Sequence, residues 1–231
     1  MENNRKLIKC IGSGSSGNCY LLTANSETLI LDAGMPIKEI KRGLNYDISH
    51  VAGCVVTHGH IDHHKSVKDI RLLGIPVFAP YLGEKKTQVT EYGGFHIVSF
   101  EVPHDGEPCV GFYITNGDLR MIYATDYEYI PVRFKRQKLT AMLIECNHVS
   151  DLLSDEEAKY SHSVFGHASL DVTKGIVAAN KTESLKVVIL CHLSNGWSDE
   201  GRMAAEVKEV AGNVNVHIAN AGESYQLFPY I

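Results

Sequence analysis

Three histidines and an aspartate fall within one short segment, THGHIDH at residues 57–63. The apolar residues before it predict a buried strand, and a strand end points His58 and His60 to the same side because its side chains alternate. The chain then takes up a helical pattern, which places Asp62 and His63 at the start of a helix. Neutral imidazoles and carboxylates bind zinc and related divalent ions. The segment therefore predicts two pairs of ligands that face two neighbouring metal ions.

Further candidate ligands stand where apolar, strand-like segments end. His104, Asp126 and His192 each follow such a segment. A carboxylate such as Asp126 can bridge two ions, so these residues would complete a two-metal centre. Asp32 ends another apolar segment, and it is better placed to accept a hydrogen bond that orients a ligand imidazole.

These residues must be positioned by strands and helices that the sequence pattern also predicts. Apolar and β-branched runs bounded by Gly, Pro, Ser and Asn predict strands at 7–11, 19–23, 28–31, 51–56, 77–79, 95–102, 110–115, 119–124, 141–144, 186–190, 214–218 and 225–228. Apolar residues at helical spacing predict helices at 37–44, 63–73, 155–160, 170–179 and 200–210.

Two strand-rich halves that each end in helices predict an α/β protein in which two sheets pack face to face with helices outside. This four-layer αββα sandwich buries both faces of each sheet. We expect residues 1–231 to form a single domain, since no linker or repeat divides them. In such a fold, ligands gather at loops along one edge of the sandwich.

Composition narrows the class of protein. The six cysteines include no C-x-x-C pair and the chain has no long apolar run, so we expect a cytoplasmic protein with reduced thiols and no membrane partner. The net charge of −5 gives no overall attraction to nucleic acid, although basic residues gather at 38–42, 65–71 and 133–138. A homodimer is compatible with this composition.

The segment GSGSSG at residues 12–17 matches the G-x-G-x-x-G pattern of dinucleotide-binding sites. Such a site needs a helix directly afterwards, so that the helix N-terminus meets the pyrophosphate. Here the next residues predict a strand, which argues against a dinucleotide site. A tight turn is the simpler account, although its amides could hold a phosphate oxygen.

Taken together, these motifs and their order resemble the metallo-β-lactamase-fold hydrolase superfamily over nearly the whole chain. The resemblance implies the αββα fold and two divalent metal ions, zinc or manganese. It also implies which residues hold each ion. One ion would be held by His58, His60 and His104, the other by Asp62, His63 and His192, and Asp126 would bridge the two.

Four further segments resemble the YycJ-type branch of this superfamily, which includes DNA exonucleases. They are GSGSSGNC at 12–19, ECNH at 145–148, GHAS at 166–169 and CHLS at 191–194. Ribonuclease Z has a comparable order, in which a Glu–His pair delivers a proton to the leaving oxygen. The resemblance therefore implies that Glu145 and His167 form the proton donor, and it places His148 and Ser194 near ligands or substrate.

A dinuclear metal-dependent phosphodiesterase is the function that these observations favour, most of all a DNA exonuclease. Two cations activate a water and clamp the oxygens of an in-line displacement. We expect Asp62 to orient that water for attack on phosphorus, while His167, tuned by Glu145, protonates the leaving oxygen. Two alternatives stay open: hydrolysis of a cyclic nucleotide or other small phosphodiester, and thioester or lactone hydrolysis of the glyoxalase II kind.

Overall fold

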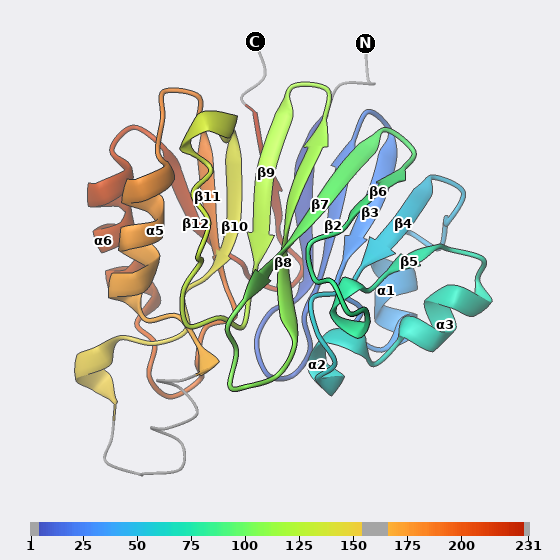
Figure 1. Ribbon diagram of the computed structural model, residues 1–231, viewed down its shortest axis with the longest axis horizontal. Helices are drawn as coiled ribbons and strands as arrows, with labels where there is room; N and C mark the ends of the chain where they lie inside the picture. Colours follow the sequence, from blue (N-terminus) through green and yellow to red (C-terminus); the bar gives the residue numbers. More distant parts are fainter. Residues whose placement is uncertain (1–4, 154–165, 229–231) are drawn as a thin grey trace.

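The computed structural model describes residues 5–153 and 166–228. Two β-sheets lie face to face, and helices cover the outer face of each (Figure 1). Helices α1 and α3 pack on one sheet, and α5 and α6 pack on the other. The four-layer αββα sandwich expected from the sequence is therefore confirmed.

The first sheet joins the N-terminal third of the chain to its end. In the described residues its order is β13-β1-β2-β3-β4-β5. The strands are β1 (Leu7–Gly12), β2 (Cys19–Ala24), β3 (Glu27–Leu31), β4 (Val51–Val55), β5 (Val77–Phe78) and β13 (Ser224–Gln226). Its helices are α1 (Ile37–Gly43), α2 (Ile61–His64) and α3 (Val67–Leu72), with the 3₁₀ turn η1 (Pro80–Leu82) after β5.

The second sheet has the order β12-β11-β10-β9-β8-β7-β6. The strands are β6 (Val89–Tyr92), β7 (Phe95–Val102), β8 (Cys109–Asn116), β9 (Leu119–Ala124), β10 (Ala141–Glu145), β11 (Val187–Cys191) and β12 (Asn215–Ile218). Its helices are α5 (Leu170–Asn180) and α6 (Glu200–Ala211), and the 3₁₀ turns η2 (Lys135–Gln137) and η3 (Ser150–Leu152) flank β10.

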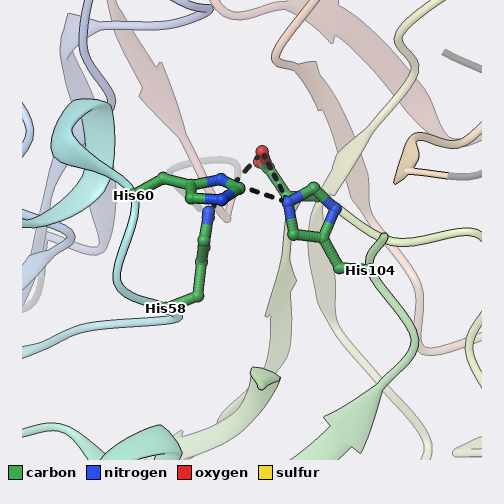
Figure 2. Close-up of side chains that lie close together, drawn as sticks. His58, His60 and His104 are labelled. Carbon is green, nitrogen blue, oxygen red and sulfur yellow. Dashed lines mark hydrogen bonds and ion pairs between the residues drawn. The ribbon is translucent and has the colours of Figure 1, made fainter. Parts of the chain in front are cut away.

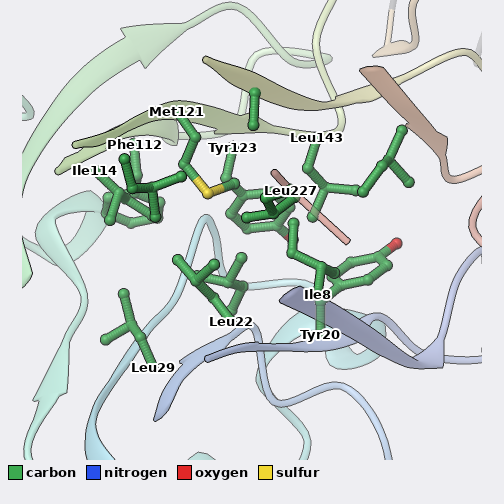
Figure 3. Packing of buried hydrophobic residues seen from close by; sticks show 14 of the residues in the cluster. Ile8, Tyr20, Leu22, Leu29, Phe112, Ile114, Met121, Tyr123, Leu143 and Leu227 are labelled. Atoms are coloured by element: carbon green, nitrogen blue, oxygen red, sulfur yellow. The ribbon is translucent and has the colours of Figure 1, made fainter. Parts of the chain in front are cut away.

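The core between the sheets is built from the inward side chains of both. Leu22 and Leu29 of the first sheet meet Phe112, Tyr123 and Leu143 of the second, and all five are fully buried (Figure 3). Burying one such side chain contributes roughly 1.5–3 kcal/mol. This packing fixes the position of one sheet on the other, and with it the site that both sheets share.

Parallel pairing brings the ends of several strands to one edge of the sandwich. Strand β3 pairs parallel with β4, and β9, β10 and β11 run parallel in successive pairs. Asp32 follows β3, Asp126 follows β9, and His192 follows β11. Strands that point the same way must end at the same edge, so residues distant in sequence meet there.

One predicted helix is interrupted in the structure. The sequence pattern predicts a single helix over 63–73, but the segment is divided into α2 and α3. The break lies at Ser66, whose N–H donates to the Ala33 carbonyl and whose hydroxyl donates to the Met35 carbonyl. These bonds hold the chain against the loop after β3, and the periodicity of apolar residues continues across the break.

Strand β6 is an element that the sequence pattern does not predict. Its four residues alternate only weakly between apolar and polar, and its edge position leaves Val89 60% exposed. The helix expected at 155–160 lies outside the described residues. The remaining predicted strands and helices are found within about two residues of their predicted ends.

Candidate metal centre

Four of the predicted ligands converge on one point. The imidazoles of His58, His60 and His104 turn toward each other at the end of β4, in α2's entry loop and after β7 (Figure 2). His104 Nε2 lies 3.3 Å from His60 Nδ1, and Asp126 Oδ2 lies 3.8 Å from His58 Nε2 and 3.9 Å from His104 Nε2. Tetrahedral ligands bonded at about 2.1 Å lie about 3.4 Å apart, so these spacings fit one shared divalent cation.

The ring of His58 gives the clearest test of that fit. Its Nδ1 lies 3.0 Å from Thr57 Oγ1, while its buried Nε2 has no hydrogen-bond partner in the described part of the chain. Burial, together with the neighbouring His63, holds the pKa of His58 well below its usual value. A neutral imidazole with a buried, unpaired nitrogen is what a metal site requires, and otherwise it would be costly.

The ring of His104 is oriented in a similar way. Its Nδ1–H donates to the carbonyl oxygen of Gly166 over 2.7 Å, which directs Nε2 toward His60. Burial lowers the pKa of His104, so the ring is neutral near neutral pH. A backbone carbonyl that fixes the far nitrogen is the usual support for a ligand histidine.

A second group lies beside the first and shares Asp126 with it. His63 Nε2 is 3.4 Å from Asp62 Oδ2 and 3.3 Å from Asp126 Oδ1, and His192 Nδ1 is 2.5 Å from Asp126 Oδ1. Although burial raises it, ion pairs with His192 and His63 bring the pKa of Asp126 well below its usual value. Asp126 therefore faces both groups as a carboxylate, the position expected of a bridging ligand.

Asp32 orients residues of this centre through hydrogen bonds. Its carboxylate is fully buried and accepts hydrogen bonds from His63 Nδ1 at 2.8 Å and from Tyr123 Oη at 2.5 Å. It also accepts from the backbone N–H of Thr57 at 2.8 Å and from the Thr57 hydroxyl at 2.9 Å. Asp32 therefore holds His63 with Nε2 directed at the shared carboxylate.

Three residues of the site have left-handed backbones. Asp32, Asp126 and His192 have φ of 57°, 54° and 52°, and each lies just beyond the end of a strand. Non-glycine residues enter this region at a cost of order 1–3 kcal/mol, and they concentrate at functional sites. The reversal of the chain at these points turns the three side chains into the centre.

Glu145 and His167 form a buried pair at the rim of the same cluster. Glu145 Oε1 lies 2.7 Å from His167 Nδ1, and Oε2 accepts from the N–H groups of Ala168 at 3.1 Å and Tyr127 at 3.3 Å. Burial alone would lower the pKa of His167, but the Glu145 carboxylate outweighs it and raises that pKa to about 9. His167 is therefore a protonated imidazolium near neutral pH.

The same pair lies close enough to Asp126 and His192 that the four residues could share a third ion. The hydrogen bonds argue against a metal at this position. Both oxygens of Glu145 already accept bonds from N–H groups, and one of these comes from His167 itself. A side chain so engaged acts as an orienting acceptor rather than as a metal ligand.

The two remaining predicted residues are His148 and Ser194. His148 is buried close to Glu145 and His167, burial lowers its pKa, and its Nδ1 has no hydrogen-bond partner within residues 5–153 and 166–228. The Ser194 hydroxyl accepts from Gly196 N–H in its own loop at 3.4 Å. In the described residues, no hydrogen bond joins Ser194 to a ligand side chain.

Asn18 is a site residue that sequence reasoning missed. Its side-chain amide is buried, bonds twice to the backbone of Gly14, and places Nδ2 2.9 Å from His63 Nε2 and 3.5 Å from Asp62 Oδ2. The segment 12–17 is thus a turn followed by a strand, as expected. Asn18 directly follows the glycine-rich segment, whose G-x-G-x-x-G pattern directs attention to backbone amides rather than to this side chain.

Comparison with known proteins identifies the family. A family model described as the metallo-beta-lactamase superfamily matches residues 12–138, more than half of the chain. The chain belongs to the metallo-beta-lactamase superfamily. It is a hydrolase, and members of this superfamily typically bind divalent metal ions, often zinc, for which the clusters of His and Asp are suited.

Three individual proteins are similar to this chain, two of them in sequence and one in structure. An exodeoxyribonuclease YycJ of Bacillus anthracis is 26% identical over 87% of this chain and 89% of its own length. An exodeoxyribonuclease WalJ of Streptococcus pneumoniae is 27% identical over 62% of this chain and 63% of its own. The metallo-beta-lactamase fold protein YhfI of Bacillus subtilis superposes with a TM-score of 0.74 at 18% identity, covering 96% of this chain and 100% of YhfI.

Helices in the described residues are all too short or too polar to cross a membrane. The six cysteines are buried, and none is joined in a disulfide.

Replacing His60 with alanine should remove bound metal. We expect wild-type protein to carry two divalent ions, zinc or manganese, and His60→Ala to lose at least the ion that His58 and His104 also face. Elemental analysis of freshly purified protein measures this. The control is His96→Ala, which removes an exposed histidine of β7 that pairs with Glu91 of β6. Equal metal content in all three proteins would contradict the ligand assignment.

Asp32→Asn should weaken metal binding without removing any ligand. The amide cannot accept all the bonds that hold His63 and Thr57, and loss of such support typically lowers metal affinity 10–100-fold. Competition with a chromophoric chelator measures the affinity, and circular dichroism checks that the variant is folded. Tyr123→Phe is the matched control, because it removes one donor to Asp32 and keeps the bond to His63. Unchanged affinity in folded Asp32→Asn would refute this role.

Proposed function

We propose that this protein is a dinuclear metal-dependent phosphodiesterase that acts on DNA as an exonuclease. The observation that carries the proposal is the buried Glu145–His167 pair, 2.7 Å apart and adjoining the carboxylate of Asp126 that both metal groups share. This pair places a proton donor beside the centre where an oxygen would leave phosphorus.

A phosphodiester of a sugar has a poor alkoxide leaving group, which needs a proton in the transition state. His167 is suited to supply it, because Glu145 raises its pKa to about 9 and keeps the ring charged near neutral pH. Glu145 engages Nδ1, so the transfer falls to the other ring nitrogen, Nε2. A thioester hydrolase has little use for this arrangement, since a thiolate leaves more readily than an alkoxide.

The metal ions would be held by the seven residues of the two groups, namely His58, His60, His104, Asp62, His63, His192 and Asp126. When bound, a pair of divalent ions supplies an acidified water and neutralises charge on the phosphoryl oxygens. Asp62 is the least buried of the acidic ligands, with a side chain 17% exposed, and Asn18 Nδ2 lies 3.5 Å from its Oδ2. This partial exposure suits Asp62 to orient the attacking water.

The choice of DNA rests on the relatives. Two curated relatives are named exodeoxyribonucleases, and one of them aligns over 89% of its own length. A small phosphodiester such as a cyclic nucleotide requires the same chemistry and is separated from DNA only by experiment.

His167→Ala should keep both metals but lose rate by about 10²–10⁴-fold on DNA, the usual contribution of a general acid. The loss should shrink on a nitrophenyl phosphodiester, because nitrophenolate leaves without a proton. Asp62→Ala should lose rate on both substrates, since it acts on the water. Steady-state kinetics with metal analysis of each variant measure these effects. An equal loss on both substrates in His167→Ala would mean that this residue binds or packs instead, and loss of metal would mean that it is a ligand.

Metal-loaded protein should hydrolyse phosphodiesters in a panel of end-labelled duplex DNA, single-stranded DNA, cyclic nucleotides and a thioester. We expect nucleotides released from DNA ends, since this matches both the site and the relatives. Turnover of cyclic nucleotides alone would select the small-substrate alternative. Thioester turnover without phosphodiester turnover would reject the proposed function.

A further inference from the structure

A basic groove lies directly beside the metal centre. It is a cavity of about 440 Å³ along α2 and α3, lined by His64, Lys65, Lys68 and Arg71, with Leu72 at its rim. The three cationic side chains, Lys65 at the end of α2 and Lys68 and Arg71 on α3, are exposed and all line this cavity. The chain as a whole has a net charge of −5, so this local charge runs against the average.

The groove is joined rigidly to the ligands. His64 lines it and follows the ligand His63 in the same short helix, and His64 Nδ1–H donates to the carbonyl oxygen of the ligand His60 over 2.8 Å. Lys65 N–H donates to the Ile61 carbonyl. A molecule lying in the groove would therefore be held at a fixed distance from the metal centre.

The charges of the groove have no acidic partners among the described residues. In the described part of the chain, no salt bridge joins Lys65, Lys68 or Arg71 to an acid. Elsewhere on the surface, Arg202 pairs with Asp151 and Lys174 pairs with Glu206. Cations left without acid partners in a groove are available to an external anion.

The opposite flank of the centre has the opposite charge. A cavity of about 380 Å³ there is lined by the ligand His104 together with Glu101, Glu107 and Glu128. Glu107 lies in the loop between β7 and β8. In Figure 1 this loop lies on one side of α2, and helix α3 lies on the other side. A polyanion at the centre is thus repelled on one side and attracted on the other.

We infer that the groove binds the phosphodiester backbone of a DNA strand beyond the scissile phosphate, so that the strand leaves the centre over α3. Helix α3 has six residues and spans about 9 Å, while a strand of B-form DNA rises about 3.4 Å per nucleotide. The groove therefore contacts two or three phosphates. This inference rests on the proposed function and names the path of its substrate.

The test is the triple variant Lys65→Ala/Lys68→Ala/Arg71→Ala. Binding of fluorescein-labelled single-stranded and duplex DNA is followed by anisotropy in EDTA, over a series of salt concentrations. The dissociation constant should rise at least tenfold. The negative slope of log affinity against log salt should become shallower by about two, because each lost phosphate contact contributes about 0.7–0.9 to it. The form of DNA that loses more affinity is the one that the groove holds.

The matched control is Lys135→Ala/Arg136→Ala/Lys138→Ala, which removes equal charge at the other end of the sheet. The Lys138 carbonyl accepts from Arg120 near the start of β9, whereas Asp126 follows the end of that strand. Affinity unchanged in the groove variant, or lost equally in both variants, would overturn the inference.

Turnover separates this inference from the proposed function. The ratio of kcat/KM for a long strand to that for a nitrophenyl ester of a single nucleotide should fall about tenfold in the groove variant. A wild-type protein that binds DNA through the groove but cleaves only a thioester would reject the nuclease and retain the groove. A wild-type protein that cleaves DNA, with the ratio unchanged in the variant, would reject the groove alone.

Discussion

The carboxylate of Asp32 is the interaction on which the site depends. It is fully buried, belongs to the first sheet, and accepts from Tyr123 of the second sheet, so it fixes the two sheets against each other at their shared edge. Hydrogen bonds to a charged acceptor contribute about 1.5–3 kcal/mol each. Replacing one such acceptor would leave His63, Thr57 and Tyr123 with buried donors that lack partners.

The same carboxylate orients one histidine of each metal group. It accepts hydrogen bonds from His63 Nδ1 and from the Thr57 hydroxyl. Because the Thr57 O–H points to Asp32, the Thr57 oxygen can in turn accept a hydrogen bond from His58 Nδ1–H at 3.0 Å. Both rings therefore donate from Nδ1 and direct Nε2 toward the carboxylate of Asp126. A buried acid at the end of one strand thus prepares ligands for both groups.

The sequence predicts the αββα fold and the candidate ligands because both depend on local signals and on their order along the chain. His58 and His60 lie two apart in one short segment and Asp126 follows an apolar strand, but it is the resemblance to the superfamily that assigns them to one centre. In the structure β4 ends at Val55, so His58 and His60 lie in the loop that leads into α2 rather than on the strand. Asn18 has no such signal, because its role arises from a loop that folds onto α2, over 40 residues away in sequence. The break at Ser66 is hidden for a similar reason, since it is fixed by bonds to Ala33 and Met35 rather than by its own segment.

Asp126 adjoins both groups of candidate metal ligands and the Glu145–His167 pair. Its Oδ2 faces His58 and His104 and also lies 4.0 Å from His167 Nδ1, while its Oδ1 faces His63 and His192. Glu145 decides what His167 does there, because it already accepts the backbone N–H groups of Ala168 and Tyr127 and has one strong acceptor position left for the ring. A carboxylate held in this way stabilises the imidazolium of His167 rather than binding a metal ion itself. His167 therefore lies next to the candidate ligands without competing for them, which is the arrangement that the proposed cleavage of a phosphodiester with a poor leaving group would require.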